Sequence, residues 1–197
     1  MTVLVDSGGA NIGSVQHALR RLGVEAPLTR DAALIASAER VILPGVGAAA
    51  WAMNTLRENG LDALIPTLTQ PVLGICLGMQ LMCQHSEEGE VDCLGLFDLK
   101  VRRFSPAAQR RVPHMGWNRL IRTADHPLLH GMGENDYAYF VHSFYVPEDE
   151  HTLAACDYHG RFAAAIGRDN FMAAQFHPER SAAVGAQILK NFLKIRA

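Results

Sequence analysis

The first ninety residues alternate between short apolar runs and longer segments with helical spacing. A strand is predicted at Val3–Val5, and Asp6 and the glycines at positions 8 and 9 end it. The following segment predicts one face of a helix, because its apolar residues recur three or four positions apart until Gly23 (Ile12, Val15, Leu19 and Leu22). A second strand is expected at Val24–Leu28, followed by a short helix that Asp31 can cap.

The alternation continues through two more apolar runs. Arg40–Leu43 predicts a third strand, closed by the segment Pro44-Gly45-Val46-Gly47, and Trp51, Leu56 and Leu64 belong to the helical stretches after it. Pro71–Ile75 is apolar throughout, which is typical of a strand covered on both faces. Repeated strand and helix segments indicate a parallel sheet with helices on both sides.

The second half of the chain has a different pattern. Short strands with turns are expected at residues 97–104, 139–146, 153–158 and 162–166, and antiparallel hairpins fit them best. A last strand, Met172–Phe176, leads to a final helix that Ser181 is expected to cap and that is buried through Val184, Ile188, Phe192 and Ile195. Since no linker or internal repeat is found, we expect one α/β domain over residues 1–197, with an open, mostly parallel sheet flanked by helices and added antiparallel strands.

Composition narrows the class of protein. The 197 residues are 49% hydrophobic and 19% charged with a net charge of −2, so no basic stripe indicates a nucleic-acid partner. No apolar run approaches the roughly 20 residues of a membrane helix, and the N-terminus is typical of a strand rather than a signal peptide. The cysteines form no CxxC pair, so a reducing, cytoplasmic compartment is expected (Cys76, Cys83, Cys93 and Cys156).

Cys76 stands in the strongest chemical motif. Gly74-Ile75-Cys76-Leu77-Gly78 has the form G-x-C-x-G, between a buried strand and an apolar helical segment. Such a turn projects a nucleophile above the sheet, and its glycines avoid clashes with the neighbouring strand and helix. The amide of Leu77 can then receive a developing oxyanion. The alternative is that Cys76 is a small buried side chain, as most cysteines are; the other three cysteines lack this context and are expected to be structural.

His177 and Glu179 follow the last predicted strand. Residues two apart on a strand point to the same side, so Glu179 can orient the His177 ring as a general base requires. An H-x-E pair alone is more often a surface pair, but the carboxyl ends of parallel strands converge on one crevice, and Cys76 lies at another such end. The remaining histidines show no metal-ligand spacing, and no phosphate-binding glycine motif is present, so no metal or cofactor is expected.

These motifs resemble the triad (class I) glutamine amidotransferases, over essentially the whole chain. The resemblance is strongest at residues 74–80 and 175–179, and it implies that family's flavodoxin-like fold. Within the family, residues 43–47, 113–118 and 139–143, with Arg180-Ser181, resemble the branch that serves imidazole glycerol phosphate synthesis for histidine. The chain departs from the family pattern at Ser7, where an aromatic residue or threonine is usual, and at Ala182, where glycine is usual.

The resemblance implies roles by position. Cys76 is similar to the nucleophile, His177 to the general acid/base and Glu179 to its orienting carboxylate, while the amides of Leu77 and Val46 are similar to the oxyanion hole, the latter in a loop expected to reorganise first. The glutamine pocket is implied at Gly45, Gly47, Gln80, Glu88, His142, Ser143 and Phe144. Residues facing a partner are implied at Asn11, Trp117, Tyr139 and Arg180. That partner is a (β/α)₈-barrel cyclase, which receives ammonia and holds the phosphorylated substrate in a heterodimer.

Three alternatives stay open at this point. Another class I amidotransferase would serve anthranilate, pyridoxal phosphate, guanylate or carbamoyl phosphate synthesis, although residues 113–118 and the single-domain length fit it less well. A stand-alone γ-glutamyl thiol hydrolase would cleave γ-glutamyl peptides without a partner. A binding module without enzymatic activity would leave Cys76 unreactive toward a glutamine-like electrophile.

Overall fold

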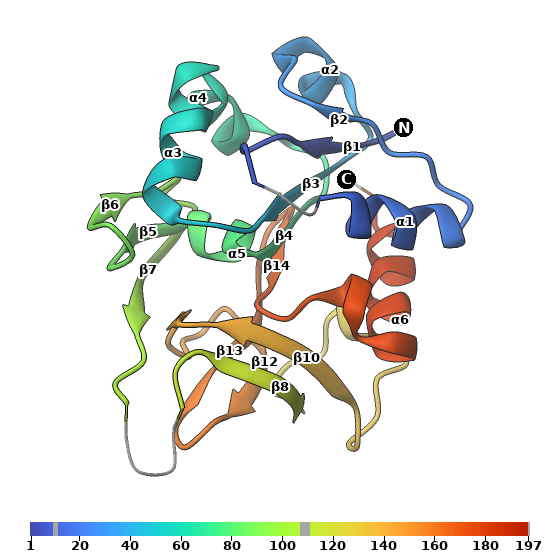
Figure 1. The fold of residues 1–197 in the computed structure, drawn as a ribbon. Helices are drawn as coiled ribbons and strands as arrows, with labels where there is room; N and C mark the ends of the chain where they lie inside the picture. Colours follow the sequence, from blue (N-terminus) through green and yellow to red (C-terminus); the bar gives the residue numbers. More distant parts are fainter. Residues whose placement is uncertain (10–11, 107–110, 197) are drawn as a thin grey trace.

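A central eight-stranded sheet organises the molecule (Figure 1). The computed structural model describes residues 1–9, 12–106 and 111–196. The strand order is β2-β1-β3-β4-β14-β13-β12-β9. Neighbours from β2 to β14 pair in parallel. These parallel strands are β1 (Thr2–Val5), β2 (Leu28–Thr29), β3 (Arg40–Gly45), β4 (Val72–Cys76) and β14 (Phe171–Ala174).

Antiparallel strands extend this sheet and form two smaller ones. In the large sheet, β14 is followed by β13 (Arg161–Arg168), β12 (Thr152–Asp157) and β9 (Ile121–Arg122). A two-stranded ladder pairs β10 (Tyr137–His142) with β8 (His114–Arg119). A four-stranded sheet has the order β11 (Phe144–Tyr145), β7 (Phe97–Arg103), β5 (Cys83–Ser86) and β6 (Val91–Asp92). The expected parallel sheet with added antiparallel strands is confirmed.

Helices cover both faces of the parallel strands. One buried cluster joins α1 (Gly13–Arg21) and α6 (Ala182–Phe192) to the side chains of Leu4, Ile42 and Leu73. A second cluster joins α2 (Ala32–Ser37), α3 (Ala49–Glu58), α4 (Leu61–Leu64) and α5 (Leu77–Leu81) to the side chains of the alternate strand positions. Short 3₁₀ turns lie at η1 (Ile65–Thr67), η2 (Pro127–Leu129) and η3 (Pro178–Arg180). In the described residues, no helix is long and apolar enough to cross a membrane.

Several predicted boundaries were wrong. The second strand begins only at Leu28, and the helix after Cys76 has five residues because the chain then enters β5, which was not predicted. Strand β8 was also not predicted. Asp31 caps α2 as expected, since its Oδ1 accepts from the amides of Ala33 and Leu34. Ser181 precedes α6 but does not cap it, because its hydroxyl donates to the carbonyl of His177 instead.

The two departures from the family pattern have visible environments. Ser7 is buried, and its hydroxyl donates to the Pro44 carbonyl at 3.2 Å. Ala182 begins α6 with φ of +47°, in the left-handed region that favours glycine. A glycine at position 182 would therefore relieve backbone strain.

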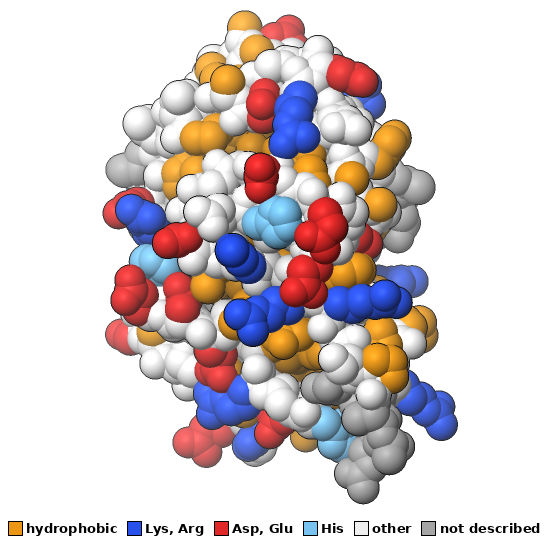
Figure 2. Space-filling view, turned by 90° about the vertical axis from the view of Figure 1, so that its left-hand side faces the viewer, with side chains coloured by type: hydrophobic (Ala, Val, Ile, Leu, Met, Phe, Trp, Pro, Cys, Tyr) orange, Lys and Arg blue, Asp and Glu red, His pale blue; other side chains and the backbone are white. Residues whose placement is uncertain are grey.

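Charged side chains of both signs share the face that carries β5, β6 and β7. Figure 2 shows Lys, Arg, Asp and Glu side chains next to one another on this face, with histidine among them. Because opposite charges are interleaved, this face presents no field of a single sign to a charged partner.

Candidate active site

Cys76 occupies a sharp turn at the carboxyl end of β4. Its backbone lies at φ 53° and ψ −107°, a strained conformation for a residue with a side chain. The adjoining glycines make the turn possible by letting backbone segments touch. A Cβ on Gly78 would lie 1.8 Å from the carbonyl oxygen of Leu43 in β3, and one on Gly74 would lie 2.9 Å from the carbonyl oxygen of Gly78. The nucleophile candidate is thus held by backbone packing on both sides.

His177 and Glu179 form a buried pair at the end of β14. Nδ1 of His177 lies 2.9 Å from Oε1 of Glu179, and the two side chains are only 6% and 3% exposed. Helix α6 packs directly against the turn that carries the pair. Gly185 of α6 lies so close to this turn that a Cβ on it would be 1.9 Å from the Pro178 carbonyl oxygen. Nε2 of His177 is buried and has no hydrogen-bond partner among the described residues.

The charge of His177 is set by its two neighbours. Burial acts to lower the pKa of His177, but Cys76 and the Glu179 carboxylate outweigh it and raise this pKa to about 10. An imidazolium is therefore favoured in the absence of substrate. Burial raises the pKa of each of the other three thiols, that of Cys83, that of Cys93 to about 11 and that of Cys156 to about 12.

One cavity of about 410 Å³ brings most of the predicted site residues together. It is lined by residues that the sequence singled out (Val46, Gly47, Cys76, Leu77, Gln80, Glu88, His142, Ser143, Phe144, His177 and Arg180) and by Val141. Gly45 does not line this cavity but a smaller one that Val46 and His177 also border. A Cβ on Gly45 would meet the Cβ of Leu77 at 2.8 Å. A larger open groove of about 640 Å³ lies beside β9, lined by residues 119–125 and 132–134, which include neither cysteine nor histidine.

Polar contacts fix two walls of this cavity. Nε2 of Gln80 donates to the Phe144 carbonyl and to Oε1 of Gln175, each at 3.0 Å. Oε2 of Glu88 accepts from the amide of Ala49 at 3.0 Å, at the start of α3. Burial raises the pKa of Glu88, while the Ala49 amide opposes that shift.

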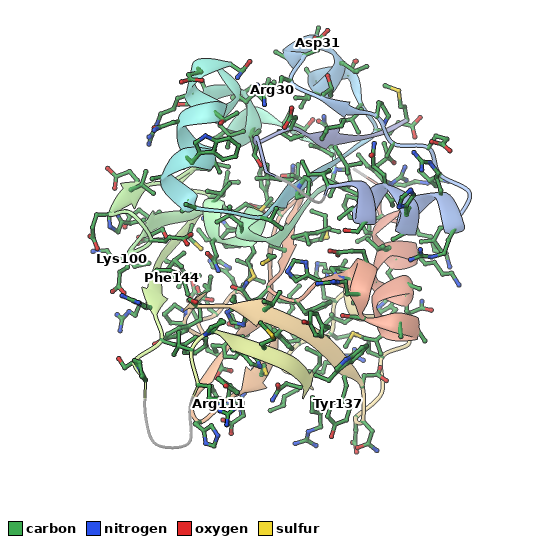
Figure 3. All side chains as sticks on the ribbon, viewed as in Figure 1. Arg30, Asp31, Lys100, Arg111, Tyr137 and Phe144 are labelled. Carbon is green, nitrogen blue, oxygen red and sulfur yellow. The ribbon has the colours of Figure 1, made fainter. Side chains whose placement is uncertain are left out.

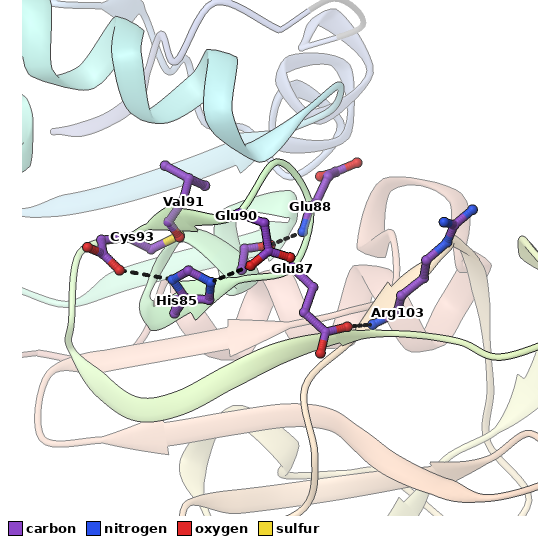
Figure 4. A network of polar contacts seen from close by, with 9 residues as sticks. His85, Glu87, Glu88, Glu90, Val91, Cys93 and Arg103 are labelled. Atoms are coloured by element: carbon purple, nitrogen blue, oxygen red, sulfur yellow. Dashed lines mark hydrogen bonds and ion pairs between the residues drawn. The ribbon is translucent and has the colours of Figure 1, made fainter.

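Glu88 is carried by a braced hairpin between β5 and β6. Figure 4 shows His85 in contact with Glu90, and Glu87 in contact with the backbone of Arg103 on β7. The other ring nitrogen of His85 contacts Asp92. The His85 contacts measure 3.4 Å to Glu90 and 2.9 Å to Asp92. The hydrogen bond to Asp92 raises the pKa of His85 despite desolvation. These contacts tie the Glu88 loop to the four-stranded sheet.

Gln175 was missed as a site residue by sequence reasoning. Its Nε2 donates to Sγ of Cys76 at 3.8 Å, and the residue is fully buried. The signal was present, since Gln175 precedes His177 by two positions and two-residue spacing along an extended chain returns to the same side. Val141 was also missed, although it adjoins His142.

Two of the residues predicted to face a partner, Trp117 and Tyr139, lie on the outer face of the β8–β10 ladder, and Arg180 reaches Tyr139 from the turn η3. Trp117 pairs with Tyr139 in the ladder, and their rings meet edge to face at 6.1 Å. The guanidinium of Arg180 lies 5.4 Å from the Tyr139 ring centroid. Met115 and Trp117 are 62% and 50% exposed, a large apolar exposure for neighbouring positions on one face. Asn11 lies outside the described residues.

Comparison with known proteins gives the family. The family described as Glutamine amidotransferase class-I matches residues 3–195. The chain belongs to the class I glutamine amidotransferases. Among curated members, the imidazole glycerol phosphate synthase subunit HisH of Bacteroides thetaiotaomicron is 54% identical over 193 residues, covering 98% of both chains. The protein of the same name from Xanthomonas axonopodis pv. citri is 55% identical over 192 residues, covering 98% of this chain and 96% of its own.

Solved amidotransferase structures share the fold at low sequence identity. A structure described as a glutamine amidotransferase gives a TM-score of 0.75 at 20% identity, covering 98% of this chain and 97% of its own. A structure described as a GMP synthase component from Thermoplasma acidophilum gives a TM-score of 0.74 at 19% identity, covering 98% of this chain and 92% of its own. The class I amidotransferase architecture is therefore shared by this chain.

Proposed function

We propose that this chain is a glutaminase subunit, one domain over residues 1–197, that hydrolyses L-glutamine to L-glutamate and ammonia through Cys76, His177 and Glu179. The proposal rests on the cavity that Cys76 and His177 both line. Cys76 lies there in a strained turn, and Nδ1 of His177 contacts the buried carboxylate of Glu179. A thiol, a base and an orienting group in this order suit acyl transfer through a covalent intermediate.

In the first half-reaction, the Cys76 thiolate adds to the carboxamide carbon of glutamine, and the C–N bond then breaks. His177 donates a proton to the departing nitrogen through Nε2, which the structure leaves without a partner among the described residues. Ammonia leaves, and a γ-glutamyl thioester remains on Cys76. Glu179 keeps the ring oriented, because its carboxylate engages Nδ1 at 2.9 Å.

In the second half-reaction, water attacks the thioester. His177 accepts a proton from the water, glutamate is released, and the thiolate is restored, so that one water is consumed for each glutamine. The oxyanion of both tetrahedral intermediates is received by the amides of Leu77 and Val46. Loss of one such donor typically costs about 10²–10³ in rate. A loop conformation that turns the Val46 amide away from the cavity therefore keeps glutamine hydrolysis slow until binding of the partner reorients the loop, and this dependence on the partner gates the activity.

The substrate pocket is suited to an amino acid. Glu88 brings a carboxylate to the cavity wall, which can pair with the α-ammonium group of glutamine. Gln80, Ser143 and Phe144 line the remaining wall, where the Ser143 hydroxyl can donate to the α-carboxylate. Gln80 instead stabilises this wall, because both hydrogens of its Nε2 are already donated to the Phe144 carbonyl and to Gln175. Gly47, with φ of +105°, lets the loop that carries Val46 turn beside the cavity.

The partner is proposed to be a (β/α)₈-barrel cyclase subunit of imidazole glycerol phosphate synthase, in histidine biosynthesis. Support comes from the names of relatives that are more than half identical to this chain. Further support comes from the aromatic face formed by the exposed Trp117 and the partly buried Tyr139. Ammonia passes to that subunit, which holds the phosphorylated substrate.

The test is glutamine hydrolysis with and without the cyclase, for the wild type and Cys76→Ser. Cys93→Ser is the matched control, because Cys93 lies on the β5–β6 side and does not line the cavity. We expect hydrolysis by the wild-type pair and the control, and none by Cys76→Ser. Robust hydrolysis by Cys76→Ser would falsify the covalent route. Strong glutaminase activity of the wild-type chain without its partner would refute the proposal that the partner gates hydrolysis. Labelling by a diazo-ketone norleucine at Cys76 separates an enzyme from a binding module.

A further inference from the structure

A buried histidine pair lies on the inner face of the β8–β10 ladder, opposite the aromatic face. His114 and His142 are direct partners in the ladder and are 0% and 6% exposed. Nδ1 of His114 lies 3.0 Å from Nε2 of His142. Aromatic rings pack around both (Phe104, Phe140, Tyr158 and Phe162). His142 borders the cavity, whereas His114 and Asn118 do not.

The pair is part of a longer hydrogen-bonded chain. Nδ1 of His142 lies 2.7 Å from the Phe144 carbonyl oxygen, the same oxygen that Gln80 approaches from the cavity side. At the other end, Nε2 of His114 lies 2.8 Å from Oδ1 of Asn118. Figure 3 shows Phe144 near the four-stranded sheet and Tyr137 at the far end of β10. The chain thus runs from β8 to the pocket wall.

The donors and acceptors fix the direction of this chain. A carbonyl only accepts, so Nδ1 of His142 carries hydrogen and its Nε2 is an acceptor when the ring is neutral. His114 must then donate through Nδ1, which leaves its own Nε2 as an acceptor. This acceptor requires a donor, and the Asn118 side chain supplies one if its amide is rotated by 180° so that Nδ2 rather than Oδ1 faces Nε2 of His114. The hydrogen-bond network decides between the two amide orientations, and here it favours the rotated one.

The competing arrangement has an imidazolium at His114, donating to Oδ1 of Asn118. Burial disfavours it, because it lowers the pKa of His114 against the effect of Asn118 and lowers that of His142 to about 3. The titratable groups facing the pair are His177, whose charge further lowers the pKa of His142, and the Tyr158 phenol, which donates to the Arg111 carbonyl at 3.0 Å. Among the described residues, no carboxylate acts on the pKa of either ring.

We propose that His114 and Asn118 are positioning residues, and that a one-way chain of donors from Asn118 through His114 and His142 holds the Phe144 carbonyl at the edge of the glutamine pocket. The proposal rests on the proposed function. Removal of the donor at His114 Nδ1 frees the Phe144 segment, which raises KM for glutamine more than it lowers kcat, because the segment touches substrate and not the reacting atoms.

Two variants of one residue separate this role from simple packing. His114→Asn places an amide near the former Nδ1 and keeps the donor toward His142, whereas His114→Gln places it near the former Nε2 and loses that donor. Both variants lose the same ring stacking, so a packing role predicts equal effects. We expect His114→Gln to raise KM by about 5- to 30-fold, the equivalent of one lost buried hydrogen bond, and His114→Asn to stay within about threefold of the wild type in the assembled enzyme. Equal KM values for the two variants overturn the proposal.

Two measurements on the isolated chain do not depend on catalysis. Nitrogen-15 spectra of labelled histidine are expected to show both rings neutral with hydrogen on Nδ1 near neutral pH; hydrogen on Nε2 of either ring, or an imidazolium, overturns the proposal. Amide exchange at Ser143–Tyr145 is expected to be faster in His114→Gln than in His114→Asn, and equal rates also overturn it. An inactive wild-type pair would refute the proposed function, and these two measurements would still decide whether the donor chain positions Phe144.

Discussion

Replacing Gly78 with alanine tests whether the elbow depends on close backbone contact. The added Cβ would lie 1.8 Å from the Leu43 carbonyl oxygen, where ordinary contact begins near 3.4 Å, so the start of α5 has to retreat from β3 by about 1.6 Å. Neither side can yield by rotating a side chain, because the contacted atoms belong to the backbone of a central strand. Overpacking of this kind costs about 1–3 kcal/mol of stability.

Activity is expected to suffer more than stability. The displaced segment carries the Leu77 amide and adjoins Cys76, and a misplacement of about 1 Å can cost on the order of 10² in rate. The assay compares glutamine hydrolysis by the assembled enzyme with chemical unfolding of the isolated chain. Gly133→Ala is the control, since a Cβ there meets nothing within 4 Å, and it should change neither quantity. Full activity of Gly78→Ala would show that the elbow tolerates a side chain, and the account of its geometry would be wrong.

Three further changes test the triad, the histidine pair and α6. Glu179→Gln keeps a hydrogen bond to His177 but removes the charge that supports its imidazolium, so hydrolysis should fall by about 10²–10⁴-fold; activity near the wild type would contradict the orienting role. Folding lowers the pKa of His142 from 6.5 to about 3. As the pH falls below 6.5, His142 is therefore protonated in the unfolded chain but not in the folded one, and the unfolding free energy decreases. Between pH 7 and pH 5 the wild type should lose about 2 kcal/mol more unfolding free energy than His142→Asn, which keeps a donor for Phe144 and does not titrate; parallel losses would refute this linkage. Ala182→Gly should raise the melting temperature, because relief of the left-handed strain of about 1 kcal/mol exceeds the entropy cost of glycine; a lower melting temperature would contradict it.

The parallel half of the fold was predictable because its signals are local. Each strand there is a short apolar run, each helix has one apolar face, and the two patterns alternate within ninety residues. The same logic located Cys76 and His177, since both follow such runs directly. Strand β5, which follows the short helix after Cys76, was not predicted because its partner is distant: Cys83 pairs with Phe97 in the four-stranded sheet, and nothing near Cys83 in the sequence indicates this.

Strand β8 escaped prediction because its polarity is reversed. Its buried face carries the polar residues His114 and Asn118, and its exposed face carries the apolar residues Met115 and Trp117. A strand normally shows the opposite alternation, so periodicity could not assign it. The polar side chains tolerate burial only because His142 and Asn118 satisfy both nitrogens of His114, and that pairing becomes visible only when β10 lies beside β8.

The close contact between Gly185 and the Pro178 carbonyl means that α6 supports the turn on which His177 and Glu179 are positioned. Position 185 touches neither the cavity nor any residue proposed to handle substrate, yet any side chain there must lift the turn that carries His177 and Glu179. A mutational scan scored by glutamine turnover should therefore find Gly185 as intolerant as the triad itself, while neighbouring solvent-facing positions of α6 accept most replacements. A substitution at Gly185 would then leave a protein that is folded and abundant but inactive. Such a variant is easily mistaken for one in which a catalytic residue has been lost.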